Sequence, residues 1–287
     1  MKKFLIFMLT LFMLCGCSVN ILENDSSRPD VSLGELPDGE VTVYSFKAGK
    51  ADAHLICGRE FTMLIDCGEK GFGKEITGYL SAHGISSLDY LVITHFDKDH
   101  VGGAAKVIKD TDVKRVLVSN CPKDSGEYHA FMEALGEKGL TAEVVRGRTE
   151  LRIGGVETVI CPPLNDTYRD SPSNNSSLMT IVRCGGCSML FAGDAEAARL
   201  DEFMRTETGH YDYVKIPYHG HFQQKLVPFL KMTSPRVAVI TCSDDQPEDP
   251  QVMKLLAAEG TAVYLTREAP VKAVCDGKTV AAFYDRQ

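Results

Sequence analysis

Four side chains that can bind a metal ion crowd into six consecutive positions of this sequence. In the stretch VITHFDKDHVGG, residues 92–103, His95, Asp97, Asp99 and His100 follow an apolar run. Two imidazoles and two carboxylates placed so closely would repel each other or lack partners if they were merely buried together. Imidazole and carboxylate ligands together suit zinc, manganese or iron, and the carboxylates argue against metals that prefer thiolates. The stretch therefore indicates a metal-binding loop.

The same residues have a simpler interpretation without a metal. His95 and His100 could cap and pack a turn between a strand and a helix. Asp97 and Asp99 would then be crowded together with no positive partner nearby except Lys98. The metal-binding interpretation explains all four side chains, and the simpler one explains two.

Two further candidate ligands follow strand-like segments in the second half of the chain. Asp194 stands in FAGDAE and His219 in KIPYHGH. If both reach the loop around residues 95–100, two metal ions can be held, with a carboxylate able to bridge them. Two alternatives are open: Asp194 could serve only as the N-cap of a following helix, and His219 could be a surface loop residue.

The segments before the metal-binding loop predict strands and one helix. Short β-rich runs at 41–46, 53–58 and 61–68 suggest an antiparallel meander. A helix around 74–84 ends at a glycine and leads into a strand at 88–94. The loop lies directly after that strand, where ligands bind in α/β sheets.

A helix expected at 102–110 follows the loop, and the polar run KDTDVKR at 109–115 is interpreted as a solvated turn. The second half repeats this order of strands and helices. Two sheets packed face to face with helices outside, a four-layer αββα sandwich of the α/β class, are the simplest way to bring the loops together. The expected elements are a hairpin at 178–194, helices at 195–204, 223–231 and 250–260, and strands at 211–217, 236–241, 262–265 and 280–284.

The N-terminus has the pattern of a bacterial lipoprotein leader. Lys2 and Lys3 precede an apolar run that is too short for a membrane span. The ending Leu-Cys-Gly-Cys resembles the lipobox, in which the cysteine after glycine becomes the lipidated first residue, here Cys17. Ordinary secretion with cleavage nearby, or a retained membrane helix, is the alternative.

This leader defines the expected organisation of the chain. A lipid on Cys17 would hold the protein at the cell membrane, on the extracytoplasmic face. The polar, aperiodic segment that follows would be a flexible tether. The expected parts are a lipoprotein signal peptide over 1–16, a lipid-anchored tether over 17–40 and one globular domain over 41–287.

Composition limits the partners. With 287 residues, 44% of them hydrophobic, and no low-complexity tract, the chain can bury a full core. Removal of residues 1–16 takes away two lysines and no acidic residue, so the formal charge moves from −8 to −10. No overall basic field is present to attract a polyanion, which counts against a processive nuclease. We expect a monomer.

Eight cysteines follow Cys17, scattered through apolar segments, and a domain of this size does not need a disulfide framework. Cys184 and Cys187 flank Gly185 and Gly186 in RCGGC, which predicts a two-residue hairpin turn with thiols on facing strands. A cross-strand disulfide is one outcome. Redox or zinc chemistry would require a helix after the second cysteine, and SMLFAGD predicts a strand.

These blocks together resemble the metallo-β-lactamase superfamily, and within it the extracellular domain of ComEC-type competence proteins. The superfamily's first loop reads HxHxDH, and HFDKDH matches it at His95, Asp99 and His100. Asp97 stands where the second histidine usually is, and an HxDxDH loop followed by GG is itself the ComEC-like pattern. The resemblance runs from about residue 41 to 283 and implies the αββα fold with two divalent metal ions, zinc or manganese.

Three further blocks carry the resemblance. FTMLIDCG resembles the preceding strand with Asp66, FAGD resembles the loop with the bridging Asp194, and VKIPYHGH resembles the HHGS loop at His219. Asp66 is equally explained as a support for a ligand or as a turn former. The expected ligands are His95 and Asp97 for one ion, Asp99, His100 and His219 for the other, and Asp194 as the bridge.

The chain also departs from its relatives. The stretch GQGD is GKAD here and keeps Asp52, whereas Tyr218 replaces the first histidine of HHGS and His221 replaces its serine. SNNSSL is similar to the Asn and Ser loop of the ComEC group. Its Asn174 and Asn175 are interpreted as turn residues or hydrogen-bond donors that support the site. Near the C-terminus, QPEDP puts an aspartate where those relatives have a histidine.

The expected chemistry is hydrolysis by an activated water. Two cations about 3.5 to 4 Å apart lower the pKa of a shared water and hold the attacking and leaving oxygens of an in-line displacement. Asp99 and His219 are the expected catalytic residues, and Asp99 could also orient the attacking hydroxide. The leading hypothesis is a phosphodiesterase acting on DNA, which the ComEC resemblance suggests, or on a cell-envelope polymer, such as choline phosphate on teichoic acid. The alternatives are a β-lactamase and a non-catalytic metal-binding lipoprotein.

Overall fold

The computed structural model describes residues 39–286. The expected signal peptide over 1–16, lipidation at Cys17 and the tether as far as residue 38 lie outside the described residues and stay predictions. In residues 39–286, no helix is long and apolar enough to cross a membrane.

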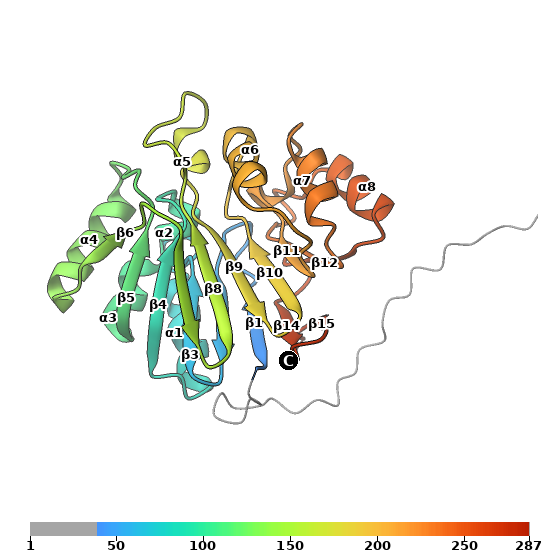
Figure 1. The fold of residues 1–287 in the computed structure, drawn as a ribbon. Helices are drawn as coiled ribbons and strands as arrows, with labels where there is room; N and C mark the ends of the chain where they lie inside the picture. Colours follow the sequence, from blue (N-terminus) through green and yellow to red (C-terminus); the bar gives the residue numbers. More distant parts are fainter. Residues whose placement is uncertain (1–38, 287) are drawn as a thin grey trace, which may run out of the picture.

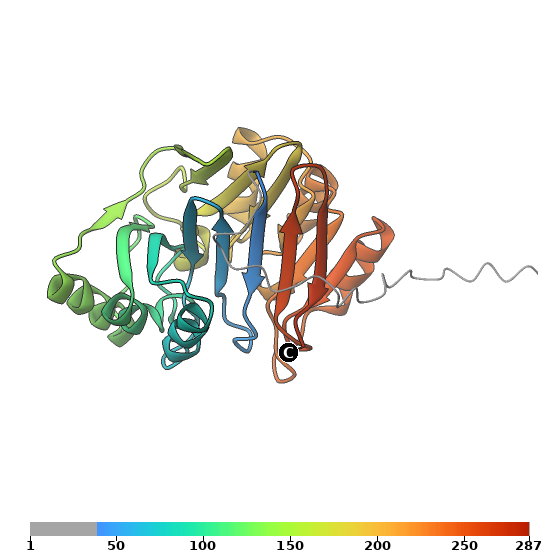
Figure 2. The same ribbon diagram turned by 90° about the horizontal axis from the view of Figure 1, so that it is seen from below.

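The first sheet has eight strands in the order β15-β14-β1-β2-β3-β4-β5-β6 (Figures 1 and 2). The meander β1-β2-β3 is antiparallel, as expected, and β3 to β6 run parallel. Two strands from the end of the chain close this sheet against β1. Its strands are β1 (Val41–Ser45), β2 (His54–Gly58), β3 (Phe61–Ile65), β4 (Ser87–Ile93), β5 (Asp112–Val118), β6 (Ala142–Val144), β14 (Val271–Cys275) and β15 (Val280–Tyr284).

The second sheet has seven strands in the order β13-β12-β11-β10-β9-β8-β7. The hairpin β9–β10 is antiparallel, and β10 to β13 run parallel. Its strands are β7 (Thr149–Ile153), β8 (Val156–Cys161), β9 (Met179–Cys184), β10 (Cys187–Phe191), β11 (Tyr213–Lys215), β12 (Val237–Ile240) and β13 (Ala262–Leu265).

Helices cover the outer face of each sheet, which completes the expected αββα sandwich (Figure 1). One set packs on the first sheet and the other on the second. The first set is α1 (Gly73–Ala82), α2 (Lys98–Val101), α3 (Ala104–Asp110) and α4 (Gly126–Lys138), and the second is α6 (Ala197–Thr206), α7 (Leu226–Thr233) and α8 (Pro250–Ala258). The short helix α5 (Pro172–Asn175) contacts α6.

Successive side chains along a strand point alternately to the core between the two sheets and to the core under the helices, which creates the layers. In β4, Tyr90 and Val92 face the core between the sheets, while Leu91 packs toward the helices. In β10, Met189 faces the inner core and Leu190 faces α6 and α7. Since successive strand side chains point to opposite faces, a strand covered on both sides must be apolar throughout.

Two local expectations were wrong. KDTDVKR is not a solvated turn, because Asp112 to Arg115 begin β5, in which Val113 and Val116 are buried. The helix expected at 102–110 begins only at Ala104, and α2 precedes it. The first error has a plain cause: exposed side chains alternate with buried ones at the start of β5, so its polar residues gave no sign of the strand.

Candidate metal centre

Expected ligands and one expected supporting residue follow the carboxyl ends of strands in both sheets. Asp66 comes after β3 and His95 after β4, while Asp194 comes after β10 and His219 after β11. These strands belong to the parallel part of each sheet, so their carboxyl ends lie at the same edge of the sandwich. Two halves of the chain therefore meet at one place.

The remaining part of the first loop is helical. Asp99 and His100 lie on α2, and Asp97 is its N-terminal boundary residue. The backbone of α2 is held by neighbouring loops: Cys67 N donates to His100 O at 2.7 Å, and Asp52 N donates to Asp99 O at 3.1 Å. These bonds fix the helix against the loop between β1 and β2 and the loop after β3.

Asp99, His100, Asp194 and His219 form the central group. Each offers one ligand atom, and these atoms all lie within 4.8 Å of one another. Asp194 Oδ2 is 3.3 Å from His100 Nε2 and 2.9 Å from His219 Nε2. Asp99 Oδ2 is 3.5 Å from His219 Nε2. Asp194 Oδ2 thus lies between the two imidazoles expected to hold one ion, where the same metal could bind all three side chains.

Asp66 supports His100 from behind. Its Oδ2 lies 2.7 Å from His100 Nδ1, and it also accepts from the Thr94 hydroxyl at 2.7 Å. Its Oδ1 accepts from Thr94 N at 2.8 Å. A carboxylate that accepts from Nδ1–H leaves Nε2 of the same ring free for a metal.

His219 has a similar support from the second sheet. Its Nδ1 lies 3.1 Å from the Thr241 hydroxyl, which in turn donates to Asp52 Oδ1 at 2.6 Å. Asp52 is fully buried between the two halves. The aspartate that GKAD keeps therefore orients a ligand through a threonine and does not itself join the central group.

His95 is oriented by two hydroxyls. Its Nδ1 lies 3.1 Å from Thr94 Oγ1 and 3.4 Å from Ser177 Oγ, and Ser177 Oγ also accepts from Asp194 N at 3.2 Å. Burial, followed by the charge of His100, lowers the pKa of His95 to about 4. The His95 imidazole is therefore neutral at physiological pH, as a ligand must be.

Unpaired buried atoms test whether this centre fits a metal. The Nε2 atoms of His95, His100 and His219 and the Oδ1 atom of Asp194 are buried and make no hydrogen bond, although all but His95 Nε2 lie within 3.5 Å of an oppositely charged group. Buried polar groups are nearly always paired, so four buried atoms without a hydrogen bond at one point, the His95 Nε2 atom above all, require an explanation. A divalent cation would use them, and imidazole with carboxylate is the donor set of zinc, manganese and iron.

Asp97 is placed differently from the other five expected ligands. Its Oδ2 faces His95 Nε2 across 4.0 Å, while its Oδ1 accepts from Lys123 Nζ at 2.8 Å and from the Ser173 hydroxyl. The Asp97 side chain is 26% exposed, and His95 is fully buried. One oxygen of Asp97 remains available to a metal beside His95, and the other is occupied by protein donors.

Lys215 is a buried cation at the centre that sequence reasoning missed. Its ammonium pairs with Asp52, donates to Gly193 O at 2.9 Å and lies 3.5 Å from Asp194 Oδ1. Burial opposes its charge, but Asp52 and Asp194 raise its pKa. The lysine stands in the apolar strand YVK, and a charged residue in a strand buried on both faces was the available signal.

Positive charge also holds the carboxylates ionised. Burial opposes ionisation of Asp99, but His219, His100 and Lys50 hold its pKa well below the usual range. Burial also raises the pKa of Asp194, but His219, His100 and Lys215 lower it further, so its pKa is well below the usual range. Lys50, the residue that replaces glutamine in GKAD, lies 2.8 Å from Asp99 Oδ2.

The backbone is strained where the ligands are presented. Asp66, Tyr218 and His219 have φ values of 59°, 50° and 52°. Such conformations cost of order 1–3 kcal/mol for each non-glycine residue and persist only where surrounding contacts impose them. At Tyr218, one such contact is the hydrogen bond that its backbone N donates to Gly193 O at 3.3 Å.

Other expected site residues lie outside the centre. Asn175 Oδ1 accepts from Arg199 N at 3.0 Å, and its Nδ2 donates to Asp170 O at 2.8 Å. Asn175 thereby joins α5 to the start of α6 and supports the loop only indirectly. Asp249, in the place of the relatives' histidine, is the N-cap of α8 and accepts from Gln251 N.

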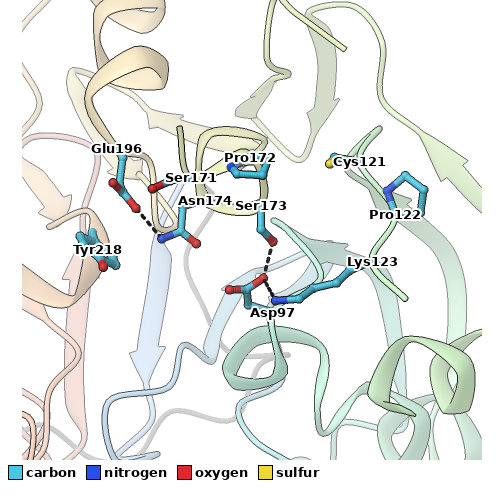
Figure 3. A pocket seen from close by; sticks show the side chains of 10 residues that line it. All are labelled: Asp97, Cys121, Pro122, Lys123, Ser171, Pro172, Ser173, Asn174, Glu196 and Tyr218. Atoms are coloured by element: carbon cyan, nitrogen blue, oxygen red, sulfur yellow. Dashed lines mark hydrogen bonds and ion pairs between the residues drawn. The ribbon is translucent and has the colours of Figure 1, made fainter. Parts of the chain in front are cut away.

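A cavity of about 440 Å³ opens beside the centre. Figure 3 shows Asp97, Lys123 and Ser173 meeting at one end of it, and Glu196 accepting from Asn174 at the other. Its other lining residues are Cys121, Pro122, Ser171, Pro172 and Tyr218. The cavity is lined by charged and polar side chains together with apolar ones from loops of both sheets, so it offers a place for a substrate next to Asp97.

The chain belongs to the metallo-beta-lactamase superfamily, whose family model matches residues 47–243. It is 28% identical over 169 residues to ComE operon protein 3 of Bacillus subtilis, covering 58% of this chain and 22% of that protein. The chain thus spans less than a quarter of that relative's length. It is also 26% identical over 180 residues to a UPF0173 metal-dependent hydrolase of Thermofilum pendens, covering 61% of this chain and 72% of that protein.

A solved structure confirms the fold. Igni18, described as a metallo hydrolase from the archaeon Ignicoccus hospitalis, is matched over 86% of this chain and 100% of that chain, with a TM-score of 0.51 and 16% identity. The expected superfamily and the expected αββα architecture are confirmed. The family and the donor set together support a metal-dependent hydrolase.

Proposed function

We propose that the protein is a metal-dependent phosphodiesterase that acts on DNA or on a phosphodiester of the cell envelope. The observation that carries this proposal is that both carboxylates of the first loop, Asp97 and Asp99, pair with a lysine. Lys50 pairs with Asp99 and Lys123 with Asp97, each at 2.8 Å. Two ammonium groups at the mouth of a metal centre suit a substrate that carries negative charge at the reacting group.

His95 and Asp97 would hold one ion, Asp99, His100 and His219 the other, and Asp194 would bridge them. When bound, the ions would supply Lewis acidity and lower the pKa of water. The ionised Asp99 carboxylate lies between Lys50 and His219, and it can accept a hydrogen bond from the attacking water and orient it. Lys50, 25% exposed, can hold a phosphoryl oxygen from the solvent side.

The choice between the two substrate classes rests on charge and resemblance. Similarity to ComE operon protein 3 supports DNA, whereas the net charge of −8 disfavours long-range attraction of a polyanion. A lipid anchor at Cys17 would place the protein beside envelope polymers on the extracytoplasmic face.

The test is hydrolysis of bis-p-nitrophenyl phosphate by the purified full-length chain, with nitrocefin as a parallel substrate. We expect turnover of the phosphodiester, faster with manganese or zinc than with magnesium, because magnesium prefers an oxygen site that keeps several waters. Linear DNA and a teichoic acid polymer, assayed side by side, separate the two classes. Turnover of nitrocefin alone would favour the β-lactamase alternative, and no turnover by metal-loaded protein would favour the non-catalytic alternative.

A further inference from the structure

Three thiols meet at the end of the sandwich opposite the metal centre. Cys184 ends β9 and Cys187 begins β10, and the two are register partners across the hairpin. Cys275 ends β14 of the other sheet. All three belong to the inner core, and their exposure is 0%, 2% and 0%. Because β10 runs from Cys187 toward Asp194, the same strand joins the thiol cluster to the metal centre.

The turns that carry these thiols are packed directly against each other. Gly186 N donates to Gly277 O at 2.8 Å. A Cβ atom on Gly185 would lie 2.4 Å from Gly277 O, so only glycine allows this approach. The hairpins β9–β10 and β14–β15 are therefore held in contact across the two sheets (Figure 1), which fixes the position of Cys275 relative to the other two cysteines.

Cys275 is the shared neighbour within the cluster. Its thiol lies 3.8 Å from Cys184 O. That contact is the hydrogen bond that the Cys275 thiol donates, and the Cys184 thiol donates to Gly39 O. The proximity of the two thiols lowers the pKa of Cys184 and, together with burial, raises the pKa of Cys275. Burial and then a hydrogen bond to Cys275 raise the pKa of Cys187 to about 12. Cys184 is thus the thiol most readily ionised of the three.

The geometry of the three thiols does not favour a metal site. Within residues 39–286, two groups bring three or more potential ligand atoms within 4.8 Å of one another, and neither contains a cysteine. The three sulfurs therefore do not form a closed set of ligands. What the geometry provides is a pair of adjacent thiols with a third beside them.

We infer that Cys184 and Cys275 form a disulfide that joins the two sheets, and that Cys187 remains a thiol beside it. In the structure all eight cysteines of the described residues are free, so this is the oxidised form of the same fold. The bond would close a loop between positions separated by 91 residues. This pairing differs from the cross-strand Cys184–Cys187 bond that the RCGGC turn suggests.

The oxidant for this reaction is an external disulfide. The Cys184 thiolate attacks one sulfur of the external disulfide, whose S–S bond breaks and releases the first thiol. Cys275 then loses its proton and attacks the Cys184 sulfur of the mixed disulfide, which releases the second thiol. Two protein thiols are oxidised and one external disulfide is reduced. Because the thiols are buried, this exchange occurs as the hairpins come together during folding.

The test starts from full-length chain in detergent, reduced and denatured, which is refolded with a mixture of oxidised and reduced glutathione. Free thiols are then alkylated under denaturing conditions and the peptides are mapped by mass spectrometry. We expect a Cys184–Cys275 linked peptide, alkylated Cys187, and a Tm roughly 10 °C above that of protein refolded in reductant.

Variants distinguish the linkage from a general effect of oxidation. Cys275→Ser and Cys184→Ser should each lose the linked peptide and the dependence of Tm on oxidant, with circular dichroism confirming that they fold. Cys57→Ser changes a buried thiol of β2 outside the cluster, so this variant should keep the linked peptide and the dependence of Tm on oxidant. A wild-type map in which Cys275 stays free or pairs with another cysteine would overturn the inference, and so would a Tm that does not depend on oxidation.

Discussion

Lys215 Nζ lies 3.5 Å from Asp194 Oδ1, and neither side chain is more than 5% exposed. A permanent cation thus stands directly behind the carboxylate that is expected to bridge the metals. The same ammonium pairs with Asp52, whose other oxygen accepts from Thr241 behind His219. Lys215 therefore connects the supports of both halves of the centre.

Loss of this cation should destabilise the fold. Lys215→Met leaves Asp52 buried beside Asp194 without its main counter-charge, and removal of one partner of a buried pair costs about 3–5 kcal/mol. We expect that decrease in the free energy of unfolding by urea denaturation of metal-free protein. The Lys215→Met/Asp52→Asn double variant should recover part of the loss. Equal stability of wild type and Lys215→Met would show that the ion pair contributes nothing.

Asp99→Ala tests the catalytic centre. It removes a ligand of the second ion and the carboxylate that orients water, so phosphodiester turnover should fall by about 10²–10⁴-fold. Circular dichroism should be unchanged. Asp97→His is the matched change within the same loop, and its effect should be smaller because histidine is the commoner ligand at that position. Unchanged turnover in Asp99→Ala, with contaminating nuclease excluded, would show that the cluster is not catalytic.

Metal binding should occur in two unequal steps. The ion beside His95 has fewer committed ligands, because one oxygen of Asp97 is occupied by Lys123 and Ser173. Calorimetric titration of metal-free protein should resolve a tight and a weak site, with two ions per chain at saturation by elemental analysis. His95→Ala should abolish the weak step and retain the tight one. Saturation of wild-type protein at one ion would contradict the two-ion proposal.

Gly103 should tolerate no side chain. A Cβ atom there would lie 2.2 Å from Cys67 O and 2.8 Å from Gly73 N, where α3 meets the loop after β3. Gly103→Ala should therefore lower stability by at least about 1–3 kcal/mol. Gly78→Ala, in the middle of α1 with no atom within 4 Å, should raise it by about 0.5–1 kcal/mol. Thermal denaturation should therefore give a lower Tm for Gly103→Ala and a higher Tm for Gly78→Ala. Similar changes in Tm for the two variants would refute the argument that Gly103 has no room for a side chain.

Lipidation is tested in a bacterial host that processes lipoproteins. The full-length chain should partition with membranes, and Cys17→Ser should appear in the soluble fraction. The reason is that a single acyl chain gives only marginal binding, whereas a lipidated N-terminus with several chains holds the protein firmly. Membrane association of Cys17→Ser equal to wild type would exclude Cys17 as the anchor.

Periodicity and motif spacing were sufficient to predict the layers and the loop of His95 to His100, because apolar runs of strand length and clustered ligand side chains are visible locally. They were not sufficient for α2, since four helical residues show no period. Lys215 and Cys275 were missed for a different reason. Their roles depend on partners in the opposite half of the chain, Asp52 and Cys184, and no local pattern shows that the sheets bring these residues together.

The ligands of the centre belong to loops of both sheets, and this has a consequence for how the protein folds. His100 and His219 cannot approach each other until both halves of the chain have formed and docked. The loops around the centre also include Asp66, Tyr218 and His219 in left-handed conformations that the unfolded chain disfavours. Metal capture should thus be the final event of refolding, and the rate at which a metal indicator is depleted would report the completion of the whole sandwich.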